Sequence, residues 1–147
     1  MIALDTNVLV YAHRQDSPFH TAASKVLRDL ADGRAPWALP WPCLHEFLAV
    51  VTHPRIYRPA SSAHVALEAV GALLALPQVH VLSESSDHAE IMAELMVNPA
   101  VVGPKVHDAR IAAICLGHGV SALWTVDRDF SWFPALTVTN PLAQGTG

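Results

Sequence analysis

Basic residues are scarce in this chain of 147 residues. It has nine Lys and Arg against 13 Asp and Glu, which gives a formal net charge of -4. A protein with this balance does not coat nucleic acid by bulk charge, so local cations or a bound metal ion must hold any phosphate-bearing partner. Charged residues make up only 15% of the chain and hydrophobic residues 52%. This composition argues against disorder and favours one folded domain.

Cysteines and long apolar runs are also scarce. Cys43 and Cys115 lie in apolar segments without a C-x-x-C pattern, so we expect two buried thiols in a reducing cytoplasm. The longest apolar run, AVGALLAL, is too short to span a bilayer. The N-terminus has no basic region typical of a signal peptide, and Asp5 interrupts its apolar run. We therefore expect a cytoplasmic protein with no membrane segment.

Short apolar segments alternate with helical patterns along the chain. Ser17, Ser62 and either Ser86 or Asp87 are the expected helix N-caps, with Pro18 opening the first of these helices. Short, non-alternating apolar strands are typical of a parallel sheet covered on both faces. We expect an α/β domain over residues 1–140 and a flexible tail at 141–147. The predicted strands are 1–4, 37–39, 79–82, 122–125 and 136–138, and the predicted helices 6–13, 18–30, 42–52, 63–76, 87–97 and 105–116.

Acidic residues follow two of these predicted strands. Asp5 comes directly after the first strand, and Asp127 and Asp129 follow the strand at 122–125 in the stretch WTVDRDF. Parallel α/β sheets bind ligands at the carboxyl ends of their strands. We therefore expect these carboxylates to lie at one edge of the sheet.

Two predicted helices carry further acids. Glu46 shares a helical face with Cys43 and Val50, and Asp108 shares one with Ala112 and Cys115. These faces are otherwise apolar, so both acids are expected on inward-facing stripes. Carboxylates that converge on one point repel each other, and a divalent cation relieves this. Oxygen ligands favour Mg²⁺ or Mn²⁺ over zinc.

Each acid taken alone also has a purely structural explanation. Asp5 can be a helix N-cap, and Glu46 can be half exposed. Asp108 can compensate a helix dipole, and Asp127 and Asp129 can form turns. A chance occurrence of the whole ordered set is much less plausible than any one of these explanations.

Four features follow one another along the chain: the stretch LDTNVLVYA, a helical Glu near one third of the chain, the stretch HDARIAA and the stretch TVDRDF. This ordered set resembles the PIN-domain nucleases, and in particular the VapC-type toxin ribonucleases. The segment HEFLAVVTHPRIY is similar to one VapC subgroup. The resemblance covers nearly the whole chain. It implies a three-layer α/β/α fold with a central parallel sheet of about five strands, and Mg²⁺- or Mn²⁺-dependent endonucleolytic cleavage of RNA.

The resemblance also implies roles for particular residues. Asp5, Glu46 and Asp108 match the core catalytic acids, and the fourth acid is Asp127 or Asp129. Asp127 is favoured because it lies nearer to the strand end. Apart from Glu46, all these acids are expected metal ligands. Asn7 and Thr125 occupy motif positions from which they can support the acids through hydrogen bonds.

Partners follow from the same resemblance. Arg14, Lys105, Arg110 and Arg128 are candidate RNA contacts, although any one of them can be ordinary surface charge. Trp37 and Trp41 can stack bases, but such tryptophans more often belong to a core or an interface. The apolar stretch AHVALEAVGALLAL can form core, a homodimer face or a groove for a cognate antitoxin.

Competing functions fit the sequence less well. An aspartyl phosphatase of the haloacid-dehalogenase type needs D-x-D-x-T, and here Asn7 stands at the second acidic position. A zinc deaminase needs P-C-x-x-C, which is missing. A receiver domain needs a late lysine, and the last one is Lys105. A catalytically inactive PIN-like module for RNA binding or protein interaction remains the main alternative, although such modules usually lack some of the acids.

Overall fold

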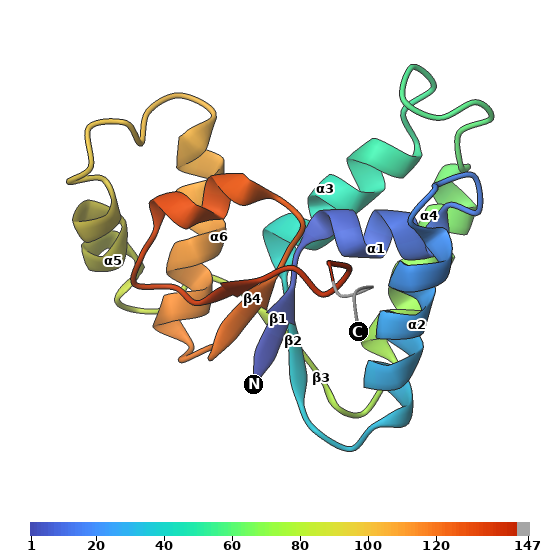
Figure 1. The fold of residues 1–147 in the computed structure, drawn as a ribbon, viewed down its shortest axis with the longest axis horizontal. Helices are drawn as coiled ribbons and strands as arrows, with labels where there is room; N and C mark the ends of the chain where they lie inside the picture. The colour runs from blue at the N-terminus through green and yellow to red at the C-terminus, as the bar shows by residue number, and fades with distance from the viewer. Residues whose placement is uncertain (144–147) are drawn as a thin grey trace.

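A five-stranded sheet forms the centre of the computed structural model, which describes residues 1–143 (Figure 1). Six α-helices and a short 3-10 helix connect and cover the strands within these residues. In chain order the elements are β1 (Ile2–Leu4), α1 (Thr6–His13), α2 (His20–Asp32), β2 (Trp37–Pro40), α3 (Trp41–Val51), α4 (Ala63–Leu74), β3 (Val79–Leu82), α5 (His88–Leu95), α6 (Lys105–Gly117), β4 (Ala122–Trp124), η1 (Arg128–Trp132) and β5 (Val138–Thr139).

The strands are all parallel and lie in the order β3-β2-β1-β4-β5. The central strand β1 pairs with β4 in a register that places Leu4 beside Trp124. The Asp5 N–H donates to the Trp124 carbonyl at 3.0 Å, just beyond the end of β1. The carboxyl ends of β1 and β4 therefore lie side by side at one edge of the sheet, which is the edge at which the sequence predicts the acids.

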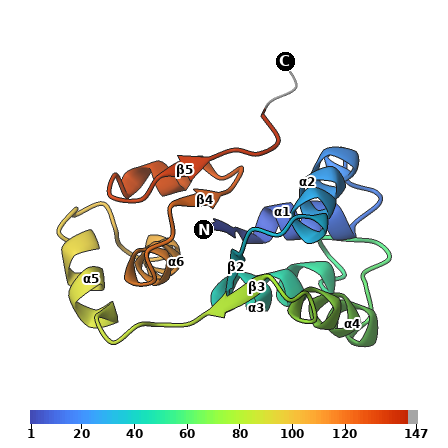
Figure 2. The same cartoon turned by 90° about the horizontal axis from the view of Figure 1, so that it is seen from below.

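Hydrophobic side chains pack on both faces of the sheet, so the predicted three-layer architecture is confirmed (Figure 2). One core joins Ala3, Ala38 and Leu123 to α5, α6 and η1. The other joins Leu4 and Leu39 to the four helices α1–α4. Because both faces are covered, the short strands carry continuous apolar sequence rather than an alternating pattern.

Helix capping explains several of the element boundaries. The Asp5 side chain accepts from the Thr6 N–H and begins α1 at the predicted residue. Ser62 accepts from the Val65 N–H and begins α4 as predicted. These caps satisfy N–H groups that have no partner within the helix.

Several predicted boundaries are wrong by up to two residues, including the ends of α4 at Leu74 and α5 at Leu95, and two of them change the description of the fold. We expected a helix from Pro18, but α2 begins at His20, because Ser17 forms a turn instead of a cap: its hydroxyl accepts from the Phe19 N–H and its carbonyl accepts from the His20 N–H. We expected the last strand at 136–138, but β5 is Val138–Thr139. Leu136 is instead buried in the core beside η1, which the sequence did not predict.

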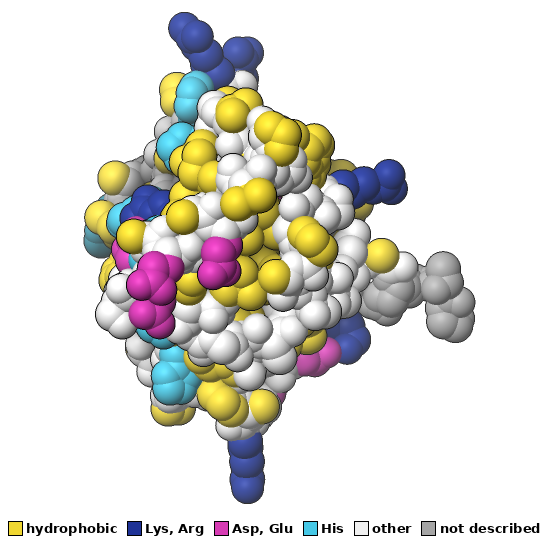
Figure 3. Space-filling model, turned by 90° about the vertical axis from the view of Figure 1, so that its left-hand side faces the viewer, with side chains coloured by type: hydrophobic (Ala, Val, Ile, Leu, Met, Phe, Trp, Pro, Cys, Tyr) yellow, Lys and Arg dark blue, Asp and Glu magenta, His cyan; other side chains and the backbone are white. Residues whose placement is uncertain are grey.

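Exposed apolar side chains remain on the surface. Figure 3 views the side that carries α5 and shows hydrophobic groups gathered across it, flanked by acidic ones. The loop after α5 contributes Val97 and Val102, which are 80% and 62% exposed. Within residues 1–143, no helix has the length and apolar character needed to cross a membrane. The predicted tail at 141–147 lies mostly outside the described residues.

Candidate active site at the ends of β1 and β4

The Asp5 carboxylate is buried at the end of β1 and held by three donors. Its Oδ1 accepts from the Thr6 N–H at 2.8 Å and from the Cys43 thiol at 3.5 Å. Its Oδ2 accepts from the Thr125 hydroxyl at 2.7 Å. Burial raises the pKa of Asp5, and these hydrogen bonds oppose that rise. Asp5 is thus both a helix cap and a fixed acid in the site, so the two explanations offered by the sequence are compatible.

Thr125 links the acids of the two strand ends. It is buried directly after β4, and its hydroxyl donates to Asp5 while accepting from the Asp127 N–H at 2.9 Å. Asp127 in turn accepts from the Asp129 N–H at 2.8 Å and begins η1. A single hydroxyl therefore fixes the turn that carries Asp127 relative to Asp5.

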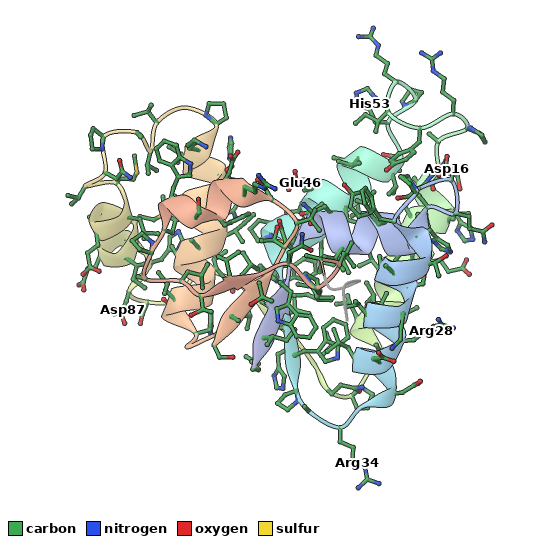
Figure 4. The ribbon with its side chains drawn as sticks, in the orientation of Figure 1. Asp16, Arg28, Arg34, Glu46, His53 and Asp87 are labelled. Carbon is green, nitrogen blue, oxygen red and sulfur yellow. The ribbon has the colours of Figure 1, made fainter. Side chains whose placement is uncertain are left out.

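Glu46 reaches the same place from α3. Figure 4 shows it between η1 and α1, and its Oε2 accepts from the Thr6 hydroxyl at 2.9 Å. The expectation that Glu46 lies on an inward apolar stripe is wrong, because Glu46 is exposed while its helical neighbour Cys43 is fully buried. The reason is that this part of α3 borders an open cleft rather than the core.

Asp108 is a second acid whose surroundings raise its pKa. It lies in the first turn of α6 and is half-buried, with Ala112 and Cys115 buried farther along the same helical face. Burial, followed by the negative charges of Asp127, Asp129 and Asp5, raises its pKa to about 6. The shift indicates that α6 brings this carboxylate against the others.

The carboxylates line one cleft of about 210 Å³. Four of the predicted acids, Asp5, Glu46, Asp108 and Asp127, border it together with Asn7. The fifth acid, Asp129, is exposed beside it. Carboxylate oxygens of Asp108, Asp127 and Asp129 lie within 4.8 Å of one another, close enough to share one cation.

The donor set of this cleft fits a hard divalent cation. Its charged groups are carboxylates, which are the ligands that Mg²⁺ and Mn²⁺ prefer. Among the described residues, the buried Asn7 Oδ1 has no hydrogen-bond partner, which leaves an oxygen at the cleft free for an ion or its water. Repulsion among the acids, visible in the raised pKa of Asp108, is the condition that such a cation relieves.

The predicted RNA-contacting cations differ in how firmly they are held. Arg14 pairs with Asp16 at 2.7 Å, lies over the Tyr57 ring and has a side chain only 12% exposed. Arg110 pairs with Glu84 at 2.6 Å. These two cations are fixed by contacts with the protein itself.

Lys105 and Arg128 are less constrained. The Lys105 ammonium lies 3.4 Å from Asp129 and 4.7 Å from the centroid of the Trp132 ring. Arg128 is exposed in the first turn of η1, next to Asp127. Lys105 lies on α6, which carries Asp108, and Arg128 lies on η1, which carries Asp129.

A larger apolar groove lies on the other side of α1. It measures about 530 Å³ and is lined mainly by residues of α1, α2 and the end of α4, including Leu9, Leu27 and Leu73. None of the acids of the cleft borders it. The chemistry of the site therefore belongs to the smaller, polar cleft.

Comparisons with known proteins agree with this geometry. A model of the PIN domain matches residues 2–135. The VapC ribonuclease Mb2897 of Mycobacterium bovis is 35% identical to this chain over 142 residues, which cover 97% of this chain and 96% of that protein. The chain belongs to the PIN-domain family, among its VapC ribonucleases.

Solved structures show the same fold at lower identity. VapC20 of Mycobacterium tuberculosis, described as a sarcin-ricin loop cleaving toxin, superposes with a TM-score of 0.66 at 19% identity and covers 89% of this chain and 93% of its own. A toxin-antitoxin complex from Klebsiella pneumoniae gives a TM-score of 0.62 at 21% identity, covering 96% and 98%. The predicted PIN fold and the resemblance to VapC ribonucleases are thus confirmed.

Two features of the site were not found in the sequence. Thr6 donates to Glu46 and so joins α1 to α3, but a threonine beside an acid gives no signal of such a contact. Trp132 lies beside Lys105 at the end of η1, whereas Trp37, which we considered as a base-stacking residue, is fully buried. Only the fold shows which tryptophan is near the acids.

Proposed function

We propose that this VapC-family protein is a divalent-metal-dependent endoribonuclease that acts as the toxin of a toxin–antitoxin pair. The observation that carries the proposal is the convergence of Asp5, Glu46, Asp108 and Asp127 on one cleft, in a chain 35% identical to a VapC ribonuclease. Mg²⁺ or Mn²⁺ is the cofactor that suits this oxygen-rich site.

The residues that would hold the ion are Asp108, Asp127 and Asp129, with Asp5 at the buried end of the cleft. When bound, such an ion lowers the pKa of water and offsets negative charge on phosphate oxygens. Of the two acids after β4, Asp127 is favoured as the fourth catalytic acid because it borders the cleft, whereas Asp129 also pairs with Lys105.

The chain's own residues supply position and proton acceptance. Thr125 fixes Asp5 and Asp127, and Thr6 fixes Glu46, so three carboxylates are oriented before substrate arrives. Glu46 is exposed to the cleft and does not belong to the closest carboxylate cluster, which suits it to accept a proton from an attacking water. Asn7 has a free acceptor oxygen that can orient the same water.

A cognate antitoxin is the proposed protein partner. The groove lined by Leu9, Leu27 and Leu73 is apolar and large enough for the side chains of an amphipathic segment. Leu67 and Leu74 are exposed seven residues apart on α4 and so share one helical face, which supports a homodimer face on the same helix. The sequence left core, homodimer face and antitoxin groove open for this stretch, and its Ala66, Val70 and Leu73 belong to the core.

Expression in a bacterial host tests the toxin role. The wild-type chain, induced without an antitoxin, should arrest growth and produce new RNA 5′ ends, whereas Asp127→Asn at the same protein level should do neither. Glu90→Gln, an exposed acid on α5, is the matched control and should arrest growth like wild type. Growth arrest by Asp127→Asn would contradict the proposed site, and harmless expression of an enzyme that cleaves RNA in vitro would contradict the toxin role.

A catalytically inactive PIN-like module remains the alternative. It predicts RNA or protein binding with no new RNA ends under any metal condition. The complete set of acids in the cleft favours the enzyme.

A further inference from the structure

Trp132 and Lys105 form a cation–π pair beside the acidic cleft. Trp132 ends η1 and is 39% exposed. Lys105 begins α6, and its ammonium lies 4.7 Å from the centroid of the Trp132 ring. An aromatic surface and a cation are therefore presented together at the surface, from two elements that are separated in the sequence by β4.

The pair is connected to the acids through Asp129. The Lys105 ammonium lies 3.4 Å from Asp129 Oδ2, and Asp129 clusters with Asp108 and Asp127. The positive charge of Lys105 also lowers the pKa of Asp108, against the larger effect of burial. The pair thus lies at the rim of the cleft, within electrostatic reach of its carboxylates.

Lys105 is held less firmly than Arg14 and Arg110. Its contact with Asp129 is a single long one, and its side chain is 26% exposed. Arg14, by contrast, has two contacts with Asp16, at 2.7 and 2.9 Å, and is only 12% exposed. A phosphate group can take Lys105 from Asp129 at little cost, because exposed ion pairs contribute little stability.

An exposed tryptophan next to a cation has the chemistry of a single-stranded nucleic-acid site. Every base has a flat face that stacks on an aromatic ring, and a neighbouring cation binds the phosphate backbone. We propose, on the basis of the ribonuclease function above, that Trp132 and Lys105 form a nucleotide-binding element. A base of single-stranded RNA stacks on the part of the Trp132 ring that Lys105 leaves exposed, and an adjacent phosphate binds Lys105, so that the strand passes the carboxylates.

The chain contains a close control for each residue. Trp41 is 38% exposed, nearly the same as Trp132, but it lies at the start of α3 and packs against His45, whereas Trp132 lies against the lysine that contacts Asp129. Lys25 pairs with Asp29 on α2 at 2.7 Å, in an exposed ion pair remote from the acids. Replacing Trp41 or Lys25 therefore removes the same kind of exposed aromatic surface or positive charge as replacing Trp132 or Lys105, but away from the proposed nucleotide-binding element.

Equilibrium RNA binding in EDTA is the decisive experiment, because it needs neither the metal nor turnover. The probe is a fluorescein-labelled single-stranded RNA of mixed sequence, followed by anisotropy. Trp132→Ala should weaken binding about tenfold or more, and Trp132→Phe should restore most of it, since phenylalanine keeps a stacking face. Lys105→Met should weaken binding and reduce the slope of log affinity against log salt by about one. Trp41→Ala and Lys25→Met should bind like wild type.

Cleavage kinetics provide the second readout. Trp132→Ala should raise KM and leave kcat nearly unchanged, because the ring binds RNA and does not touch the reacting phosphate. Equal binding and equal KM for Trp132→Ala and Trp41→Ala would overturn the inference while leaving the ribonuclease function intact. A wild-type protein that neither binds nor cleaves RNA would overturn both.

Discussion

Replacing Asp108 by Asn should stabilise the metal-free protein while removing its activity. The carboxylate is half-buried among three other acids, and its pKa is raised to about 6 from an ordinary 3.8. A shift of this size corresponds to about 3 kcal/mol of unfavourable free energy for the charged form at neutral pH. Because Asp108 is partly exposed and lies at a helix N-terminus, screening and the helix dipole reduce this to about 1 kcal/mol.

The pH dependence of this effect has a definite sign. Since the pKa is higher in the folded state, the folded protein binds more protons than the unfolded chain between about pH 4 and pH 6. Wild-type stability in EDTA is therefore lost as the pH rises through this window. Asp108→Asn lacks that loss, so the variant should equal wild type near pH 4 and exceed it by about 1 kcal/mol at pH 7.5.

Urea unfolding in EDTA at the two pH values measures the effect, and thermal unfolding should show a rise in Tm of about 2–4 °C at pH 7.5. The matched control is Glu90→Gln, which removes an exposed acid from the first turn of α5. The control should lose a few tenths of a kcal/mol, because it loses the attraction to the helix N-terminus without relieving any repulsion. An Asp108→Asn variant that is less stable than wild type at pH 7.5, or whose gain is the same at both pH values, would refute the reasoning.

Four further substitutions have expected outcomes. Thr125→Val removes the buried hydroxyl that donates to Asp5, so urea unfolding should show a loss of about 1–3 kcal/mol, and a loss below 0.5 kcal/mol would contradict this. Glu46→Gln should abolish RNA cleavage but change stability by less than about 0.5 kcal/mol, because Glu46 is exposed; retained cleavage would exclude it from the reaction. Gly71→Ala should stabilise the protein by about 0.5–1 kcal/mol, because Gly71 is exposed in the interior of α4. Gly119→Ala should destabilise it, because Gly119 has φ +67, and equal shifts in Tm for the two variants would contradict this difference.

Much of the fold was predictable because strong local signals agreed with the global pattern. The apolar residues before Asp5 gave the central strand, and Asp5 itself gave the start of α1 at the predicted residue. At the predicted boundaries that were wrong, the local sequence signal was ambiguous. Ser17 and Pro18 suit a turn as well as a helix start, and the structure uses the turn.

The site was predictable as a set of acids but not in its detail. The strand pattern predicts a parallel sheet with Asp5 and Asp127 at one edge, but only the fold shows that β1 pairs with β4 and so brings the two acids together. The exposure of Glu46 depends on where α3 borders the cleft, which helical periodicity does not reveal. Likewise, the approach of Lys105 to Trp132 depends on how η1 packs against α6, and no local sequence pattern encodes it.

RNA cleavage by purified wild type and Asp108→Asn, each with Mg²⁺, Mn²⁺ or EDTA, decides whether these acids form a metal-dependent nuclease site. Because the variant is expected to be at least as stable as wild type without metal, a loss of cleavage cannot be attributed to unfolding. We predict that wild type cleaves RNA only with a divalent ion and that Asp108→Asn does not cleave under any condition. Full cleavage by Asp108→Asn, or cleavage by wild type in EDTA, would contradict the proposed site.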